Sequence, residues 1–373
     1  MDSESFNRSQ NKDFSSVPRN NTRRITLGPV AVGRGAPVSV QTMTNTDTRD
    51  VKSTVSCIKE VMDAGCDIVR LAVPDAEAAA ALSEIRKQTR GVPLVADIHF
   101  DWRLAMLSLD AGIDGLRINP GNIGGGEKVR RVAKAANQRN VPIRIGVNGG
   151  SLEPELLQQY GGATPEALVD SALRHVTILE NADFGNIKIS VKASDVHRTV
   201  AAYRLLSSRT CYPLHLGLTE AGTFLAGTVR SSVAMGILLS EGIGDTVRIS
   251  LTDTPLKEVI AGQEILRCLS LRAPGPNVTS CPTCGRTQAD VINTAIAVEA
   301  ALEKLYREEP AIARPHIAVM GFVINGPGEG RDADIALVGG NNFFYLYIRG
   351  ERVLKVSEEE AVRAVVEAVR EYK

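Results

Sequence analysis

The sequence has no net charge and no long apolar run, and each absence excludes a class of protein. Its 43 Lys and Arg residues balance 43 Asp and Glu residues over 373 positions. A balanced chain has no global basic field to attract nucleic acid or an acidic membrane surface. No apolar run reaches the length that a membrane-spanning helix requires. We therefore expect a protein that works with neither nucleic acid nor membrane.

The N-terminal segment lacks the features of a targeting sequence. Residues 1–24 are polar, rich in Ser, Asn and Arg, and contain no apolar core of a secretory signal. Asp2, Glu4 and Asp13 argue against an organelle transit peptide, because such peptides are poor in acidic residues. These observations predict a flexible tail over residues 1–24 and a cytoplasmic location.

The six cysteines do not form the framework of a disulfide-rich protein in a chain of this length. We interpret four of them as small buried apolar residues: Cys57, Cys66, Cys211 and Cys268. Cys281 and Cys284 alone have the Cys-x-x-Cys spacing with which two thiols bind one metal centre. Zinc, a redox dithiol and an iron–sulfur cluster each require further ligands or a different context. The spacing alone completes none of the three.

Short apolar runs alternate with amphipathic helical segments from about residue 25 to residue 272. Several helical segments begin with Asp or Thr, as helix N-caps do. Eight runs have the length of a strand: Ser39–Thr44, Ile68–Val73, Pro93–His99, Gly115–Asn119, Pro142–Asn148, Ile187–Ser194, Pro213–Thr219 and Thr246–Thr252. Eight such units predict an α/β fold, a closed (β/α)₈ TIM barrel, over residues 25–272. An open doubly wound sheet is the alternative, but no Gly-x-Gly-x-x-Gly follows the first strand.

The pattern changes after Leu271. Pro and Gly within Arg272–Val278 indicate a linker, and the Cys-x-x-Cys follows it. The remaining elements expected are helices at Asp290–Arg307 and Ser357–Tyr372 and strands at His316–Val323, Asp334–Val338 and Phe343–Ile348. Helices grouped with closely spaced strands predict a smaller α+β domain over residues 273–373.

Five strand-like runs place a cation among apolar neighbours: Arg70, Arg117, Arg144, Lys192 and Arg248. A buried unpaired cation has a high free-energy cost, so these side chains need anions. Asp97 and Glu220 are the only evident carboxylates at strand ends, which leaves an excess of positive charge. Guanidinium groups suit phosphate oxygens, and barrel enzymes bind ligands at the carboxyl ends of their strands. The runs therefore predict a phosphorylated or diphosphorylated substrate, with an internal salt-bridge network as the alternative.

Polar residues share a strand face with several of these cations. Period-2 alternation puts Asn119, Asn148 and Ser250 on the same faces as Arg117, Arg144 and Arg248, respectively. The same alternation aligns Asp97 with His99. His99 and His215 lie in strand-like runs, where a lone histidine is more often a hydrogen-bonded core residue than a metal ligand.

Longer motifs resemble one protein family. They are Val40-Gln41-Thr42-Met43-Thr44-Asn45-Thr46, Asp97-Ile98-His99-Phe100, Arg117-Ile118-Asn119-Pro120-Gly121, Arg144-Ile145-Gly146-Val147-Asn148, Ser190-Val191-Lys192-Ala193-Ser194-Asp195, His215-Leu216-Gly217-Leu218-Thr219-Glu220-Ala221-Gly222 and Glu241-Gly242-Ile243-Gly244-Asp245-Thr246. Two C-terminal motifs, Thr279–Arg286 and Gly321–Glu329, extend the match. Over about residues 24–373 the chain resembles the bacterial 4-hydroxy-3-methylbut-2-enyl diphosphate synthases, the IspG/GcpE family.

The resemblance implies a barrel followed by an iron–sulfur domain, in a homodimer where the cluster domain of one subunit caps the barrel of the other. It implies reductive ring opening and dehydration of 2-C-methyl-D-erythritol 2,4-cyclodiphosphate to 4-hydroxy-3-methylbut-2-enyl diphosphate, in the methylerythritol phosphate route to isoprenoids. Two electrons would arrive one at a time through a [4Fe–4S] cluster, from flavodoxin or ferredoxin.

The resemblance also implies roles for single residues. The cyclodiphosphate would be bound by Arg70, Arg117, Arg144, Asn148, Lys192, Arg248 and Ser250. Asp97 and His99 would shape the pocket, and Glu220 would act as a catalytic residue in proton transfer. Cys281, Cys284 and Glu329 would bind the cluster, and Glu329 would leave its iron when substrate oxygen binds.

Phe322 departs from this pattern, since it stands where the third cluster cysteine of the family is expected. A phenyl ring offers iron no lone pair, so we expect impaired cluster assembly and turnover. Because the other motifs are intact, we interpret Phe322 as a recent or artificial Cys→Phe change in a synthase. The alternatives are a relative that binds the cyclodiphosphate without catalysis, a replacement thiol from Cys268, and a second domain stabilised by zinc.

Overall fold

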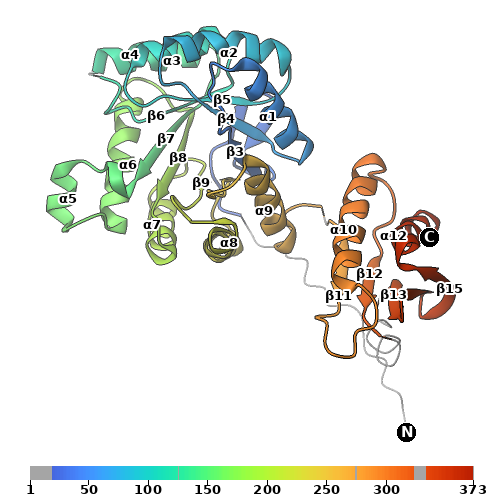
Figure 1. Cartoon of the computed structure of the whole chain (residues 1–373). Coiled ribbons are helices and arrows are strands. Elements are labelled where there is room, and N and C mark those ends of the chain that lie inside the picture. The colour runs from blue at the N-terminus through green and yellow to red at the C-terminus, as the bar shows by residue number, and fades with distance from the viewer. Residues whose placement is uncertain (1–18, 125, 274, 323–332, 373) are drawn as a thin grey trace. The chain divides into compact units, whose positions relative to one another are not determined.

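The computed structural model describes residues 19–124, 126–273, 275–322 and 333–372 (Figure 1). The chain divides into two compact units, Met1–Arg272 and Ala273–Lys373. No helix within the described ranges is both long and apolar enough to cross a lipid bilayer.

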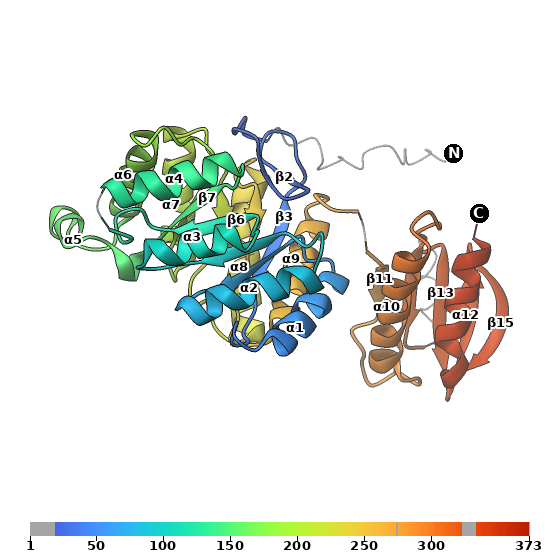
Figure 2. The ribbon, with the colours of Figure 1, turned by 90° about the horizontal axis from the view of Figure 1, so that it is seen from above.

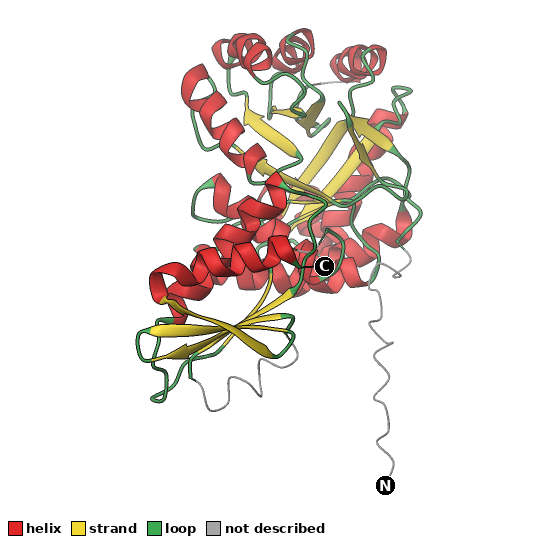
Figure 3. Cartoon of the chain, turned by 90° about the vertical axis from the view of Figure 1, so that its right-hand side faces the viewer, coloured by secondary structure: helices red, strands yellow, loops and turns green. Residues whose placement is uncertain are grey.

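Eight parallel strands form the centre of the first unit, and helices surround them (Figure 3). The strands are β3 (Ser39–Met43), β4 (Ile68–Ala72), β5 (Leu94–Asp97), β6 (Gly115–Ile118), β7 (Ile143–Asn148), β8 (Ile187–Lys192), β9 (His215–Leu216) and β10 (Thr246–Val247). Their order in the sheet is β8-β7-β6-β5-β4-β3-β10-β9. A parallel bridge between Ile189 and Leu214 joins β8 to the segment entering β9 and closes the ring. The predicted TIM barrel is confirmed, with one strand in each of the eight apolar runs.

The outer layer consists of helices. They are α1 (Val51–Asp63), α2 (Ala76–Gln88), α3 (Trp102–Asp110), α4 (Gly126–Gln138), α5 (Pro154–Tyr160), α6 (Pro165–Glu180), α7 (Val196–Arg209), α8 (Phe224–Ser240) and α9 (Pro255–Cys268). Of these, α1, α2, α3, α6 and α7 begin at a side chain that caps the first turn. Asp75 accepts a hydrogen bond from the backbone N–H of Ala78 at 2.8 Å, and Asp195 accepts one from Arg198 at 2.7 Å. Each bond satisfies an N–H group that the first helical turn leaves free.

Alternation along β7 separates the two faces of the barrel wall. Ile143, Ile145 and Val147 are buried in the apolar layer between strands and helices. Arg144 and Gly146 have the opposite parity, so they face the barrel interior. On the other strands the same alternation turns polar side chains toward the barrel interior and apolar side chains toward the surrounding helices.

A short hairpin seals the amino-terminal end of the barrel. Strands β1 (Ile25–Leu27) and β2 (Val30–Val32) pair antiparallel and pack against Ile68 and Val95 in a separate apolar cluster. The sequence analysis did not predict this hairpin, because two three-residue strands carry little periodic signal. 

The segment before the hairpin contacts the barrel from Arg19 onward, although residues 1–24 were expected to form a tail. Arg19 forms an ion pair with Asp245 at 2.9 Å. The backbone N–H of Asn20 donates to the carbonyl of Gly242 at 3.0 Å. Residues 1–18 lie outside the described ranges.

The described part of the second unit is a five-stranded sheet with the helices α10 (Val291–Glu308) and α12 (Glu358–Glu371) on one face (Figure 2). Its strands are β11 (Asn277–Ser280), β12 (His316–Met320), β13 (Ile335–Gly340), β14 (Phe343–Ile348) and β15 (Glu351–Ser357). Strands β11, β12 and β13 are parallel, and β14 and β15 continue the sheet antiparallel. The α+β arrangement agrees with the prediction, but part of the expected linker Arg272–Val278 belongs to β11.

The prediction for the four isolated cysteines is half wrong. Cys57 and Cys66 are buried, as expected, whereas Cys211 and Cys268 are exposed. Cys211 lies in the turn between α7 and β9, and Cys268 is the last residue of α9. Both therefore lie at the ends of elements, where apolar burial is incomplete.

Candidate functional site

The structure places all five predicted cations in the barrel interior. Arg70, Arg117, Arg144 and Lys192 are buried, and the side chain of Arg248 is 18% exposed. The strands β4, β6, β7 and β8 carry the first four, and Arg248 directly follows β10. The barrel therefore brings together charges that are up to 178 positions apart in the sequence.

Asp97 lies between two of these guanidinium groups. Its carboxylate is 3.2 Å from Arg117 Nη1 and 3.7 Å from Arg70 Nε. Burial disfavours the charged carboxylate, but attraction to Arg70, a hydrogen bond with His99 and attraction to Arg117 outweigh it and lower the pKa of Asp97. Asp97 is therefore ionised and holds both arginines in place.

Gly146 makes room for two guanidinium groups on adjacent strands. A Cβ atom at position 146 would lie 2.8 Å from Arg117 Nε and 3.2 Å from Arg144 Nη1. Arg117 Nη2 donates to the carbonyl of Gly146 at 3.1 Å, and Arg144 Nη1 donates to Ser190 Oγ at 2.6 Å. A glycine is required here because any side chain would displace the cations.

Lys192 lies in a similar position beside Gly217. A Cβ atom at position 217 would lie 2.5 Å from Lys192 Nζ. Burial, followed by repulsion from Arg144 and Arg248, holds the pKa of Lys192 well below its ordinary value. Burial, followed by repulsion from Arg70 and Arg117, likewise lowers the pKa of Arg144. In the absence of a bound anion, the barrel interior therefore destabilises the charged forms of Lys192 and Arg144.

Glu258 is a carboxylate that the sequence analysis missed. It lies on α9, is 5% exposed and pairs with Arg248 Nη2 at 3.3 Å. It also accepts hydrogen bonds from Thr42 Oγ1 at 2.7 Å and from the backbone N–H of Leu251 at 3.0 Å. The carboxylates predicted from the sequence lie at strand ends, whereas Glu258 lies on a helix and reaches the strands only in the folded barrel.

Lys188 is a sixth cation, also missed. It lies on β8 four residues before Lys192 and opposite Arg144 in the register. It is 2% exposed, and burial followed by repulsion from Arg144 lowers its pKa to about 7. The alternation Ile-Lys-Ile-Ser-Val-Lys gives Lys188 the same inward parity as Lys192, so the signal was present.

The other predicted site residues differ in exposure. Asn148 lies opposite Lys192 at the carboxyl ends of β7 and β8, and Ser250 is partly buried after β10. The His99 side chain is 56% exposed and lies 3.0 Å from Arg117 Nη1. Glu220 is exposed and has a left-handed backbone, with φ of 54°. These four residues lie at or after the carboxyl ends of the strands, which is the end of the barrel where TIM-barrel enzymes bind their ligands.

His215 is a core residue with one ring nitrogen bonded. It is fully buried, and its Nδ1 lies 2.7 Å from Thr246 Oγ1. Burial, followed by repulsion from Lys192 and Arg144, holds its pKa well below the ordinary value. His215 is therefore neutral, which agrees with its interpretation as a core histidine.

The barrel interior holds more positive than negative charge. Arg70, Arg117 and Arg248 pair with Asp97 or Glu258. Within the described part of the chain, Arg144, Lys188 and Lys192 form no ion pair. Repulsion among these groups is relieved when a ligand with several negative charges enters.

The Cys-x-x-Cys motif follows β11 in the second unit. Cys281 is half-buried, and its backbone N–H donates to the carbonyl of Val319 at 2.9 Å. Cys284 is exposed, and hydrogen bonds from the backbone and side chain of Arg286 lower its pKa. A thiolate is the form that binds a metal, so the spacing of the pair and the lowered pKa of Cys284 suit a soft metal.

Phe322 occupies a buried position in the same unit. It is 9% exposed, and the guanidinium of Arg286 lies 4.9 Å from the centre of its ring. In the described ranges, no group of three His, Cys, Asp or Glu residues is arranged to hold a metal ion. Glu329, the expected oxygen ligand, lies outside the described residues. The described residues thus supply two thiols and do not complete the ligand set of a [4Fe–4S] cluster.

Both units match models of one family. The GcpE TIM-barrel domain matches residues 22–263, and the GcpE protein C-terminal domain matches residues 277–371.

Curated relatives give the same result. A protein of Geobacter sulfurreducens named 4-hydroxy-3-methylbut-2-en-1-yl diphosphate synthase (flavodoxin) is 55% identical over 93% of this chain and 97% of its own length. Proteins of the same name from Maridesulfovibrio salexigens and Ruminiclostridium cellulolyticum are 54% and 51% identical, over 92% and 95% of this chain and 94% and 99% of their own lengths. The chain therefore belongs to the GcpE family.

Proposed function

We propose that the chain is a 4-hydroxy-3-methylbut-2-enyl diphosphate synthase by descent, which binds 2-C-methyl-D-erythritol 2,4-cyclodiphosphate in its barrel. The reaction of this class is reductive opening of the ring with loss of water. The names of relatives above 50% identity support it, as does the size of the match. The observation that carries the proposal is the presence of two buried cations, Arg144 and Lys192, that pair with no described carboxylate, since the cyclodiphosphate brings two negatively charged phosphates.

The geometry suggests how the binding site works. Arg144 and Lys192 are available to bind phosphate oxygens, because no described carboxylate pairs with them. Asp97 and Glu258 orient the other guanidinium groups, so these are already in place when the ligand arrives. In this proposal Asn148, Ser250 and Glu220 complete the mouth of the site, with Glu220 moving a proton.

The electron-transfer half of the reaction is where this chain departs from its class. A [4Fe–4S] cluster supplies single electrons when it is bound, but Cys281 and Cys284 are the only ligands we find for it within the described ranges. We propose that Phe322 replaces a third cysteine ligand and that turnover is therefore low. The second candidate function, binding of the cyclodiphosphate without catalysis, is favoured by the same residue.

The partners follow from the class. We propose flavodoxin as the electron donor, with ferredoxin as the alternative, because the relatives carry flavodoxin in their names. We also propose a cytoplasmic location.

A homodimer is part of the proposal, and the surface of α8 supports it. Four apolar residues at four-residue spacing are exposed along this helix: Leu225, Val229, Val233 and Ile237. The helix Phe224–Ser240 carries a single charged residue, Arg230. An apolar stripe of this kind suits a second copy of the same helix. Sedimentation of Val229→Glu checks this, and a variant that sediments like the wild type would contradict the assignment of the face.

Calorimetric titration of the cyclodiphosphate into the purified protein tests the proposal. We expect saturable binding that weakens with added salt, because several cations contact the phosphates. Lys192→Met removes one of these charges, retains the length of the side chain, and should weaken binding by at least about tenfold. Arg267→Met on the outer helix α9 is the matched control and should bind like the wild type. Absence of binding by the wild type would refute the proposed substrate.

A further inference from the structure

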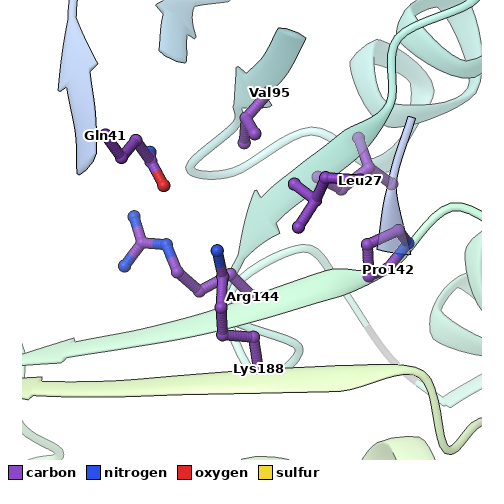
Figure 4. Close-up of a pocket in the computed structure, with 7 residues that line it drawn as sticks. Leu27, Gln41, Val95, Pro142, Arg144 and Lys188 are labelled. Carbon is purple, nitrogen blue, oxygen red and sulfur yellow. The ribbon is translucent and has the colours of Figure 1, made fainter. Parts of the chain in front are cut away.

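A small polar cavity lies inside the barrel beneath the cations of the site. Its volume is about 10 Å³, and its polar lining consists of Gln41, Arg144 and Lys188. Figure 4 shows the ends of these three side chains turned toward one space, with Leu27 and Pro142 on another side. Leu27 belongs to the hairpin that seals the barrel, so the cavity lies between the polar barrel interior and the apolar cluster of the hairpin.

The polar atoms around this cavity have no hydrogen-bond partner in the described protein. They are both amide atoms of Gln41, Nε and Nη2 of Arg144, and Nζ of Lys188. All three residues are at least 96% buried. Nearly all buried polar groups in proteins are hydrogen-bonded to protein or to ordered water, so a cluster of this kind requires a shared partner.

The size and chemistry of the cavity favour one water molecule. A polar space of roughly 10–15 Å³ holds a single water that makes two to four hydrogen bonds. Nε and Nη2 of Arg144 are donors, and the Gln41 Oε1 atom is an acceptor. Because the pKa of Lys188 is lowered to about 7, its amine also offers a lone pair when neutral. One water can accept from the two Arg144 groups and donate to Gln41 Oε1 and to the neutral amine of Lys188, which leaves only Gln41 Nε2 of the five atoms without a bond to it. A halide ion would accept hydrogen bonds only.

We propose that Gln41 and Lys188 are positioning residues that fix the guanidinium of Arg144 through one buried water molecule. Ser190 holds Nη1 of Arg144 on one side at 2.6 Å. The water holds Nε and Nη2 on the other side, so the plane of the guanidinium is set before a ligand arrives. Neither residue touches the ligand, and each acts on binding through Arg144. The effect on ligand affinity rests on the proposed function, but the water site itself does not.

A crystal structure of the full-length protein tests the water site directly. We expect one spherical density peak within hydrogen-bond distance of Arg144 and of Gln41 or Lys188. An empty cavity would overturn the proposal. Crystals soaked in bromide distinguish the two small guests: an anomalous peak in the cavity would identify a halide site and would also overturn it.

Calorimetry with the cyclodiphosphate tests the positioning role. Gln41→Leu and Lys188→Met retain most of the side-chain volume and remove the polar atoms, and each should weaken binding roughly tenfold. The double variant should lose little more than either single variant, since both act through one water. Independent, additive losses or unchanged affinities would refute the shared water.

Val95→Ala is the matched control, because Val95 lines the same cavity and offers no polar atom. It should lower the melting temperature without changing the affinity. If the wild-type protein does not bind the cyclodiphosphate, the proposed function fails, whereas the crystal structure still decides the water site.

Discussion

Gly217 lies directly against the amine of Lys192. A Cβ atom at position 217 would be 2.5 Å from Lys192 Nζ and 2.7 Å from the backbone oxygen of Arg248. The lysine amine can move, but the backbone oxygen cannot do so without shifting the strand. The absence of a side chain at position 217 therefore allows Lys192 to point into the barrel.

Gly217→Ala should weaken binding of the cyclodiphosphate by about tenfold or more, because the methyl group displaces Lys192. Isothermal titration calorimetry measures the change. Gly126→Ala, at the first position of α4 with open space around it, is the control and should leave the affinity unchanged. Equal affinities for Gly217→Ala and the wild type would show that the position of Lys192 does not matter.

Loss of the Glu258 carboxylate should destabilise the barrel. Glu258→Ala leaves the guanidinium of Arg248 and the N–H of Leu251 without their acceptor, and the expected cost is about 3 kcal/mol of unfolding free energy. Urea unfolding, followed by the fluorescence of the single tryptophan, Trp102 on α3, measures it. Glu264→Gln on the exposed side of the same helix should change the stability by less than about 0.5 kcal/mol. A similar effect of both variants would argue against the buried pair.

Binding of the cyclodiphosphate should take up protons. In the free protein, burial and then repulsion from Arg144 and Arg248 lower the pKa of Lys192, whereas Glu258 raises it only weakly. A bound dianion favours the charged amine, so the pKa rises on binding and the affinity falls as the pH increases. At a pH where the free amine is largely neutral and the bound amine is charged, the enthalpy of binding should therefore depend on the ionisation enthalpy of the buffer.

Lys192→Met is the variant that identifies the group. It should remove most of the buffer dependence, because methionine cannot be protonated. An unchanged proton uptake in this variant would assign the protons to another group, such as Lys188.

Phe322→Cys should restore cluster assembly. Anaerobic reconstitution followed by iron and sulfide analysis should give contents that approach a [4Fe–4S] cluster, and turnover with reduced flavodoxin should rise with them. Phe322→Ala removes the ring that stacks on Arg286 without supplying a thiol, so it should restore neither. If alanine and cysteine act alike, the defect is steric and position 322 is not a ligand position.

The eight barrel strands were predictable because the apolar runs are separated by helical segments, several of which begin at a capping Asp or Thr. Asp75 and Asp195 show how closely the sequence marks the starts of the helices. The strands β9 and β10 are only two residues long, yet their runs were recognised from apolar composition alone. The hairpin β1–β2 was missed because three-residue strands show no measurable period.

The charges of the site were predictable in kind but not in number. Arg117 and Arg144 were recognised because a cation between large aliphatic residues is unusual in a barrel strand. Glu258 was missed, since its partner Arg248 is ten residues away on a different element and only the fold brings them together. The stacking of Arg286 on Phe322 is likewise a tertiary contact that no spacing rule predicts.

The ion pair between Arg19 and Asp245 decides where the protein can be shortened. Asp245 is 2% exposed and accepts a hydrogen bond from the N–H of Leu214 at 2.8 Å, so its side chain is held in place beside the starts of β9 and β10. Burial already raises the pKa of Asp245, and truncation at Ile25, the first residue of β1, would raise it further by removing the attraction of Arg19 and the hydrogen bond from Thr22. Any fusion partner or affinity tag should therefore be joined ahead of Arg19. Such a fusion retains the ion pair between Arg19 and Asp245, the residue directly before β10.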